Sequence, residues 1–186
     1  MFKASSAVLA AAALFSLAGT SQAAVQVLGT SLASSCSQAA FSGDSSVAAL
    51  GACSRSISEE VIPLSDRAAT HVNRGILLMR NRNFEAARRD FERAVELKPE
   101  LAEAYANRGS VLVVEGRFPE AVADFDRALE LGLAQPERTY FNRAVAREWM
   151  DDAKGAYLDY RKAAQLNPEW STPREQMVRF TVTSSR

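Results

Sequence analysis

Small and aromatic residues recur at helical spacing through the second half of the chain, with a period of 34 or 35 residues. Each block contains an alanine, an aromatic residue four positions later and a second alanine three positions after that: Ala87, Phe91 and Ala94; Ala121, Phe125 and Ala128; Ala156, Tyr160 and Ala163. Spacings of three and four residues place such side chains on one face of an α-helix. A repeat of this length predicts stacked helical pairs, because no single pair can bury its apolar face alone.

A second motif, Asn-Arg followed by a small residue, precedes each block: Asn73-Arg74-Gly75, Asn107-Arg108-Gly109 and Asn142-Arg143-Ala144. We expect this motif on the first helix of each pair, with its small residue facing the first alanine of the second helix. Small residues at such a contact let two antiparallel helices approach closely.

The two motifs together resemble the tetratricopeptide repeat family, in which a small residue in helix A is followed by small and aromatic residues in helix B. The resemblance implies an all-α fold, a right-handed superhelical stack of helix-turn-helix units with a C-terminal capping helix. It sets the repeats at 68–101, 102–135 and 137–170, and the capping helix at 172–180 within a last segment, 171–186. The family's tryptophan position holds other residues here: His71, Tyr105 and Tyr140.

An arginine precedes an aspartate by sixteen residues in every repeat: Arg74 and Asp90, Arg108 and Asp124, Arg143 and Asp159. The gap is unchanged by the extra residue between the second and third repeats, so it belongs within each helical pair. We therefore expect an ion pair from helix A to helix B in each repeat. The alternative is that both residues are independently solvated.

The start of the chain has the layout of a secretory signal peptide. An uncharged apolar run at residues 7–18 follows Lys3, and small residues at Ser21 and Ala23 fit the cleavage rule. The run is shorter than the roughly 20 residues that a membrane span needs. We expect residues 1–23 to be removed, leaving no membrane span and placing the mature protein in the periplasm or outside the cell.

The only two cysteines, Cys36 and Cys53, follow the predicted cleavage site. In an oxidising compartment such a pair is usually a disulfide. Free thiols and a metal site are the alternatives, although two cysteines and the single histidine are too few for a four-ligand zinc site. By the family register, segment 24–67 is a degenerate helical pair at about residues 30–60, with the disulfide joining its helices. The competing interpretation is an N-terminal arm with an incidental disulfide.

Composition excludes several classes of function. The 22 basic and 22 acidic residues become 21 and 22 once the predicted leader with Lys3 is removed. A nearly neutral chain gives no reason to expect nucleic-acid binding, which needs a basic surface. We find no catalytic arrangement, no phosphate-binding loop and no metal-ligand set, so we predict no enzyme activity, cofactor or metal. We expect His71 to be structural.

The resemblance also implies a ligand site, because the A helices of tetratricopeptide stacks line a concave groove. The groove positions would be Val72, Asn73, Ile76, Arg80, Asn107, Ser110, Arg138, Phe141, Asn142 and Trp149. The three asparagines would form a ladder of side-chain amides that suits the backbone of an extended peptide. The aromatic residues would be anchors. The alternative is that each asparagine merely satisfies neighbouring backbone.

The family's carboxylate-clamp pattern requires Lys and Asn where Val72 and Ile76 stand, so we do not predict capture of a peptide C-terminus. We predict a periplasmic scaffold that binds a protein or peptide. The alternatives are a self-associating structural protein or a non-catalytic subunit of an envelope enzyme complex. The oligomeric state and the partner's identity do not follow from the sequence.

Overall fold

The computed structural model describes residues 2–4, 24–27 and 31–182. Within these ranges the helices are α2 (Leu32–Ser42), α3 (Val47–Glu59), α4 (Leu64–Arg80), α5 (Phe84–Leu97), α6 (Ala102–Val114), α7 (Phe118–Leu131), α8 (Glu137–Trp149), α9 (Ala153–Leu166) and α10 (Thr172–Met177). Two short strands, β1 (Phe2–Ala4) and β2 (Phe180–Val182), pair in antiparallel fashion.

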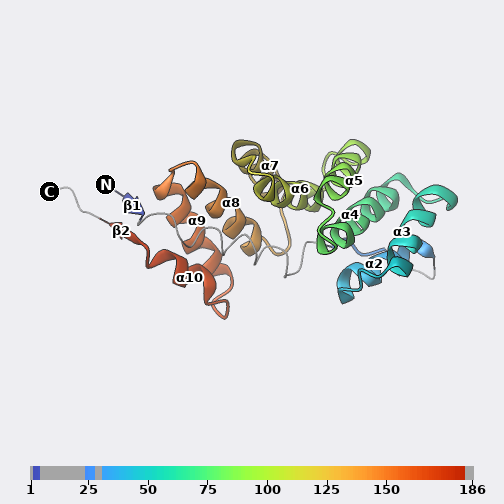
Figure 1. Cartoon of the computed structure of the whole chain (residues 1–186), viewed down its shortest axis with the longest axis horizontal. Coiled ribbons are helices and arrows are strands. Elements are labelled where there is room, and N and C mark those ends of the chain that lie inside the picture. The colour runs from blue at the N-terminus through green and yellow to red at the C-terminus, as the bar shows by residue number, and fades with distance from the viewer. Residues whose placement is uncertain (1, 5–23, 28–30, 183–186) are drawn as a thin grey trace.

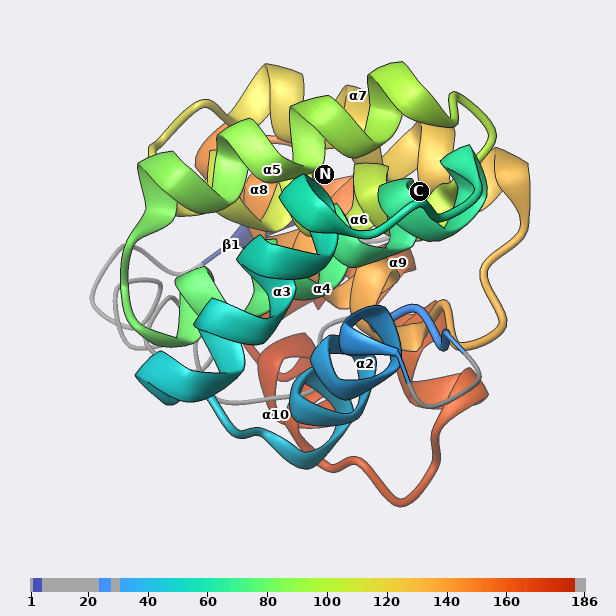
Figure 2. The same ribbon diagram turned by 90° about the vertical axis from the view of Figure 1, so that its right-hand side faces the viewer.

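The helices form an elongated stack in chain order, from α2 and α3 at one end to α10 at the other (Figure 1). Each helix packs mainly on its neighbours in the sequence, within the pairs α4–α5, α6–α7 and α8–α9 and between successive pairs. The first helices of successive pairs, α4, α6 and α8, also contact one another directly, so they form the inner layer of the curved stack. In the end-on view α5 and α7 cover this layer from one side (Figure 2). The predicted all-α superhelical stack is confirmed.

Glycine allows the two helices of the first and second repeats to approach closely. A Cβ at Gly75 would lie 2.5 Å from the Phe91 ring, and one at Gly109 would lie 2.7 Å from the Phe125 ring. Both rings are fully buried. The motif glycines are therefore needed for close packing, as predicted, but each faces the aromatic residue of the second helix and not its first alanine.

Arginine and aspartate join the two helices of every repeat at the predicted spacing of sixteen residues. Nε and one Nη of each arginine donate to the two carboxylate oxygens at 2.7–2.8 Å, in the pairs Arg74–Asp90, Arg108–Asp124 and Arg143–Asp159. The aspartates are buried. The expected ion pairs are confirmed, and they are buried bidentate contacts rather than solvated charges.

The first repeat differs from the others in its supporting contacts. His71 Nδ1 lies 2.9 Å from Asp90 Oδ1. Tyrosines hold this position in the later repeats, where the Arg108 guanidinium lies 5.5 Å from the Tyr105 ring and that of Arg143 lies 5.3 Å from the Tyr140 ring. The residue at this position therefore contacts one member of the Arg–Asp pair in each repeat. The contact of His71 with Asp90 agrees with the structural role that we expected for the histidine.

The pKa of Asp90 reflects this environment. Burial acts to raise the pKa, but hydrogen bonds from Arg74 and His71 outweigh burial and lower it below its usual value. The carboxylate is therefore ionised at neutral pH and stabilises the fold in that form.

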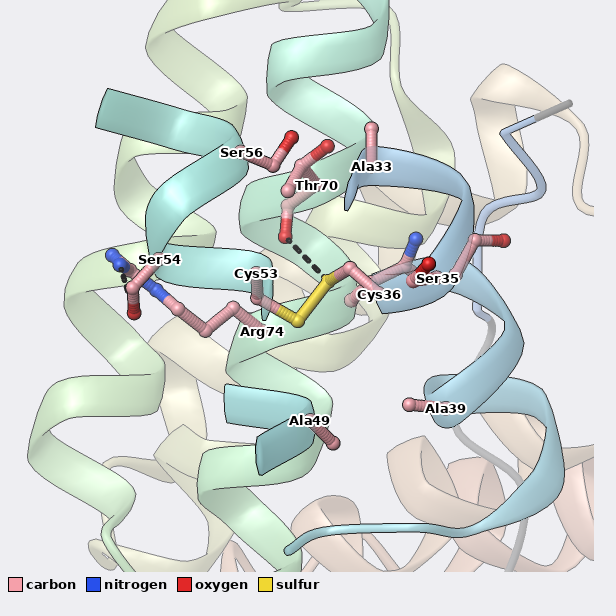
Figure 3. The surroundings of a disulfide bond; sticks show 12 residues. Ala33, Ser35, Cys36, Ala39, Ala49, Cys53, Ser54, Ser56, Thr70 and Arg74 are labelled. Carbon is pink, nitrogen blue, oxygen red and sulfur yellow. Dashed lines mark hydrogen bonds between the residues drawn. A yellow bond between two sulfur atoms is a disulfide. The ribbon is translucent and has the colours of Figure 1, made fainter. Parts of the chain in front are cut away.

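Helices α2 and α3 form a pair ahead of the first repeat, and a Cys36–Cys53 disulfide joins them (Figure 3). Both cysteines are fully buried. The disulfide lies beside α4, with the Cys36 sulfur 3.9 Å from the carbonyl oxygen of Thr70. Small residues supply most of the apolar contacts of this pair. The disulfide therefore provides stability that larger buried side chains would otherwise provide.

Glu60 fixes the start of α2 against the end of α3. Its carboxylate accepts hydrogen bonds from the Leu32 and Ala33 N–H groups at 2.8 and 3.0 Å, and from the Ser56 hydroxyl at 2.6 Å. A carboxylate is stabilising at this position because the first N–H groups of a helix have no partner within the helix.

The C-terminal cap is shorter than the 172–180 helix that the sequence predicted. Helix α10 ends at Met177, and Phe180 begins β2 instead of continuing the helix. The turn buries Phe180 beside the rings of Tyr157 and Tyr160, at centroid distances of 6.0 and 6.1 Å. Residues 181 and 182 belong to β2, and residues 183–186 of the predicted last segment lie outside the described part of the chain.

A polar network ties the same end of the chain to α8. The Tyr160 hydroxyl donates to Glu148 at 2.7 Å, and Arg179 donates to the same carboxylate oxygen at 2.8 Å. Burial, reinforced by the negative charge of Glu148, raises the pKa of Tyr160, so the phenol remains a donor.

The predicted signal peptide, 1–23, lies outside the described residues except for β1. Among the helices that the structure describes, none combines the length and the apolar character needed to cross a membrane.

Candidate functional site

Asn73, the first asparagine of the predicted ladder, binds an extended segment of the same chain. The Val25 N–H donates to Asn73 Oδ1 at 2.9 Å, and Asn73 Nδ2 donates to the Val25 carbonyl at 2.6 Å. The side-chain amide thus pairs with both backbone groups of one residue, as a neighbouring β-strand would. Asn73 is fully buried in α4, and Val25 lies 48 residues before it.

Ser37 in α2 completes this contact from the other side. The Val27 N–H donates to Ser37 Oγ at 3.1 Å, and Ser37 Oγ donates to the Val25 carbonyl at 3.1 Å. Val27 is buried against Ala33 and Ala69. Helices α2 and α4 therefore hold the extended segment through its backbone and its alternate apolar side chains.

The other two asparagines lie on the next inner helices. Asn107 Nδ2 donates to the Glu103 carbonyl of its own helix at 2.8 Å. Asn142 Nδ2 donates to Ser110 Oγ at 3.1 Å, joining α8 to α6. Ser110 in turn donates to the Ala106 carbonyl at 2.9 Å. The expected amides are therefore present on three successive inner helices, but each has a different partner.

Arg80 and Arg138 add positive charge to the predicted groove set. Among the described residues neither forms a salt bridge, and the Nη1 of Arg80 is buried without a hydrogen-bond partner. The Arg138 guanidinium lies 5.3 Å from the Trp170 ring. Burial lowers the pKa of both arginines.

Three of the predicted groove residues are buried in packing contacts. Val72 and Ile76 are fully buried in the core of the first repeat, and Phe141 is buried against Tyr160. These three apolar side chains lie at contacts between helices and are almost inaccessible to solvent. Trp149 is half-exposed, but its ring stacks on a residue of the outer layer, Phe118 at the start of α7, at 5.4 Å.

Segment 24–27 and Ser37 were not among the predicted site residues. The sequence signal for the segment was the alternation of Val25, Gln26 and Val27, which is the period of an extended strand. In the structure Val27 is buried and Gln26 is exposed, in agreement with that period. The segment directly follows the predicted cleavage site.

Comparison with known families agrees with this geometry. The family model described as Tetratricopeptide repeat matches residues 72–136, which span most of the first and second repeats. This match and the observed helical stack support membership of the tetratricopeptide repeat family. No curated protein matches it by sequence.

Solved tetratricopeptide structures superpose on the stack. The crystal structure of YrrB, a tetratricopeptide repeat protein with an unusual peptide-binding site, is 26% identical with a TM-score of 0.61, over 69% of this chain and 63% of that chain. The Arabidopsis OM64 tetratricopeptide domain is 22% identical with a TM-score of 0.60, over 63% and 96% of the two chains. MamA from Desulfovibrio magneticus RS-1 is 18% identical with a TM-score of 0.64, over 76% and 77%.

The fold is thus that of a protein-interaction scaffold. Proteins of this family are generally non-catalytic and bind proteins or peptides.

Proposed function

We propose that this protein is a non-catalytic scaffold of the periplasm that binds an extended segment of a peptide or envelope protein along its inner helices. The asparagines of the ladder would read the backbone of that segment. The periplasmic location rests on the leader-like start of the chain and agrees with the buried disulfide.

The contact between Asn73 and Val25 carries this proposal. A side-chain amide with donors and an acceptor matches the N–H and carbonyl of one extended residue, and the distances of 2.9 and 2.6 Å agree with that pairing. This recognition does not depend on the side chain of the bound residue. The same surface chemistry therefore suits other extended segments.

The repetition of the asparagine supports a longer site. Asn107 and Asn142 occupy the motif position of Asn73 on α6 and α8. The inner helices contact one another directly, so equivalent positions follow each other along one face. An extended ligand running across this face would meet one amide on each inner helix.

The likeness to YrrB gives independent support, since that protein has a peptide-binding site on a similar stack.

Partner capture in cells tests the proposal. The full chain would be expressed with its leader in a bacterial periplasm, crosslinked, purified and analysed for bound proteins. We expect a defined partner that is lost when Asn107 and Asn142 are both changed to Ala. Gln165→Ala, an exposed amide on α9, is the matched control and should retain the partner. Retention of the partner by the double variant would contradict binding along the inner helices.

Self-association is a second candidate, favoured by the exposure of Trp149 and Met150. These neighbouring side chains are 46% and 45% exposed at the end of α8. Two large apolar side chains in solvent are a feature of interaction surfaces. Light scattering would detect a concentration-dependent dimer, and Trp149→Ser should abolish it if this surface is responsible.

A further inference from the structure

The segment Ala24–Val27 occupies a binding position on the inner helices as a ligand would. It is not helical, and Asn73 and Ser37 hold it through backbone groups. Four hydrogen bonds involve only two residues of the segment, Val25 and Val27. Hydrogen bonds to the backbone of an extended peptide also supply affinity when a peptide strand adds to a sheet, and here side chains of two helices make such bonds.

Apolar contacts define the side chains that this position accepts. Val27 is 8% exposed and packs with Ala33 and Ala69, while Ala24 and Val25 pack against the core of the first repeat. The intervening Gln26 is exposed. The position therefore accepts an extended segment with small or β-branched residues at every second place. The residues between them face solvent, so any side chain fits there.

Because the segment is covalently connected to α2, it competes strongly with any separate peptide for the position beside Asn73 and Ser37. Residues 28–31 alone separate Val27 from the start of α2 at Leu32. A short tether gives an effective concentration in the millimolar range. A peptide from another protein must therefore displace a tethered segment that is present at high local concentration.

We propose that Ala24–Val27 is a built-in ligand that occupies the position beside Asn73 and Ser37. This segment must leave before an extended peptide with apolar side chains at alternate residues binds there. This inference rests on the proposed function and adds its regulation. After cleavage at the predicted site, Ala24 would be the first residue of the mature chain. The built-in ligand would then be a free N-terminus, able to leave without moving a helix.

Binding of a labelled peptide tests the inference. The probe is a fluorescent synthetic peptide with the sequence of residues 24–29, added to full-chain variants and followed by anisotropy. V25D/V27D should release the built-in ligand, because each charge would enter an apolar site. Q26D is the matched control, with the same charge on the exposed side of the same segment.

We expect V25D/V27D to bind the probe about tenfold more tightly than the wild type or Q26D. The apparent affinity scales with the fraction of molecules whose site is open, and a segment bound in about nine molecules of ten gives this factor. Asn73→Ala in the V25D/V27D background should remove the binding. Equal affinities in the wild type and V25D/V27D, binding that survives Asn73→Ala, or no binding to any variant would each overturn the inference.

A second measurement needs no substitution. In ¹⁵N-labelled wild-type protein, excess unlabelled probe should speed hydrogen exchange at the Val25 and Val27 amides and leave the buried α4 residue Leu77 unchanged. Unchanged exchange at Val25 and Val27 would mean that the segment is a fixed part of the fold.

These readouts use only the probe peptide and positions 25, 27 and 73. The proposed function is tested by partner capture at Asn107 and Asn142, so its failure would be distinguishable from failure of the built-in ligand.

Discussion

The buried ion pair of the second repeat should contribute more to stability than any exposed pair of the same chain. Arg108 donates two hydrogen bonds of 2.7 Å to Asp124, whose side chain is only 10% exposed, while that of Arg108 is 23% exposed. Removing one partner of a buried pair costs about 3–5 kcal/mol, because the other charge is left without compensation. Since Arg108 is partly exposed, we expect Arg108→Met to lower the free energy of unfolding by about 3 kcal/mol, the low end of that range.

A double-mutant cycle isolates the pair from the other effects of each substitution. Arg108→Met, Asp124→Leu and the double variant would be unfolded in urea and followed by circular dichroism. The double variant should lose less than the sum of the single variants, with a coupling energy of about 2 kcal/mol. The apolar replacements have similar size, so neither leaves a large cavity.

Arg93 and Glu96 supply the internal control. Their side chains are 53% and 63% exposed, and their ion pair has a distance of 2.7 Å, the same as that of the buried pair. Exposed pairs couple by no more than about 1 kcal/mol. A coupling energy for Arg108 and Asp124 no larger than that of this control would refute the reasoning, because burial would then add nothing.

Three further predictions concern stability. Gly109→Ala should destabilise the protein by about 1–3 kcal/mol, because its Cβ would lie 2.7 Å from a buried ring. Gly51→Ala, with no atom within 4 Å, should instead stabilise it by up to about 1 kcal/mol, and urea unfolding of both checks the contrast. Changing Cys36 and Cys53 to Ala should cost about 3 kcal/mol for a sequence separation of 17, as measured by urea unfolding without reductant. Because the folded-state pKa of Asp90 is lowered, its stabilisation is present above the unfolded pKa of about 3.9 and is lost as pH falls through the folded value. Asp90→Asn should therefore lower the free energy of unfolding at about pH 7. Below about pH 4 the free energy of unfolding of this variant should depend less on pH than that of the wild type.

The stack could be predicted because its determinants are periodic. The Arg–Asp spacing of sixteen residues is the same in all three repeats, and each instance forms the expected contact between helices. The disulfide followed from the predicted compartment and from the family register. Local pairing within a helical repeat needs no knowledge of distant parts of the chain.

The binding residues were harder to predict, because inner helices of a stack are packed on several sides. Val72, Ile76 and Phe141 match groove positions of the family, yet here they fill the core. The partner of Asn73 could not be found from a repeat pattern, since Val25 lies 48 residues away in a segment with no equivalent in the repeats. Likewise, Phe180 leaves the expected helix because a turn buries its ring against α9.

Site-specific photo-crosslinking tests the central claim most directly. A photoreactive amino acid would replace Ser110 on the inner helix α6 or, as the matched control, Leu158 on the outer helix α9, which is 38% exposed. After irradiation of cells, mass spectrometry would map the attached partner segment. Binding along the inner helices predicts one extended segment attached at position 110 and lost when Asn107 and Asn142 are changed to Ala. Attachment that is equal at position 158, or that survives these substitutions at position 110, would contradict the claim.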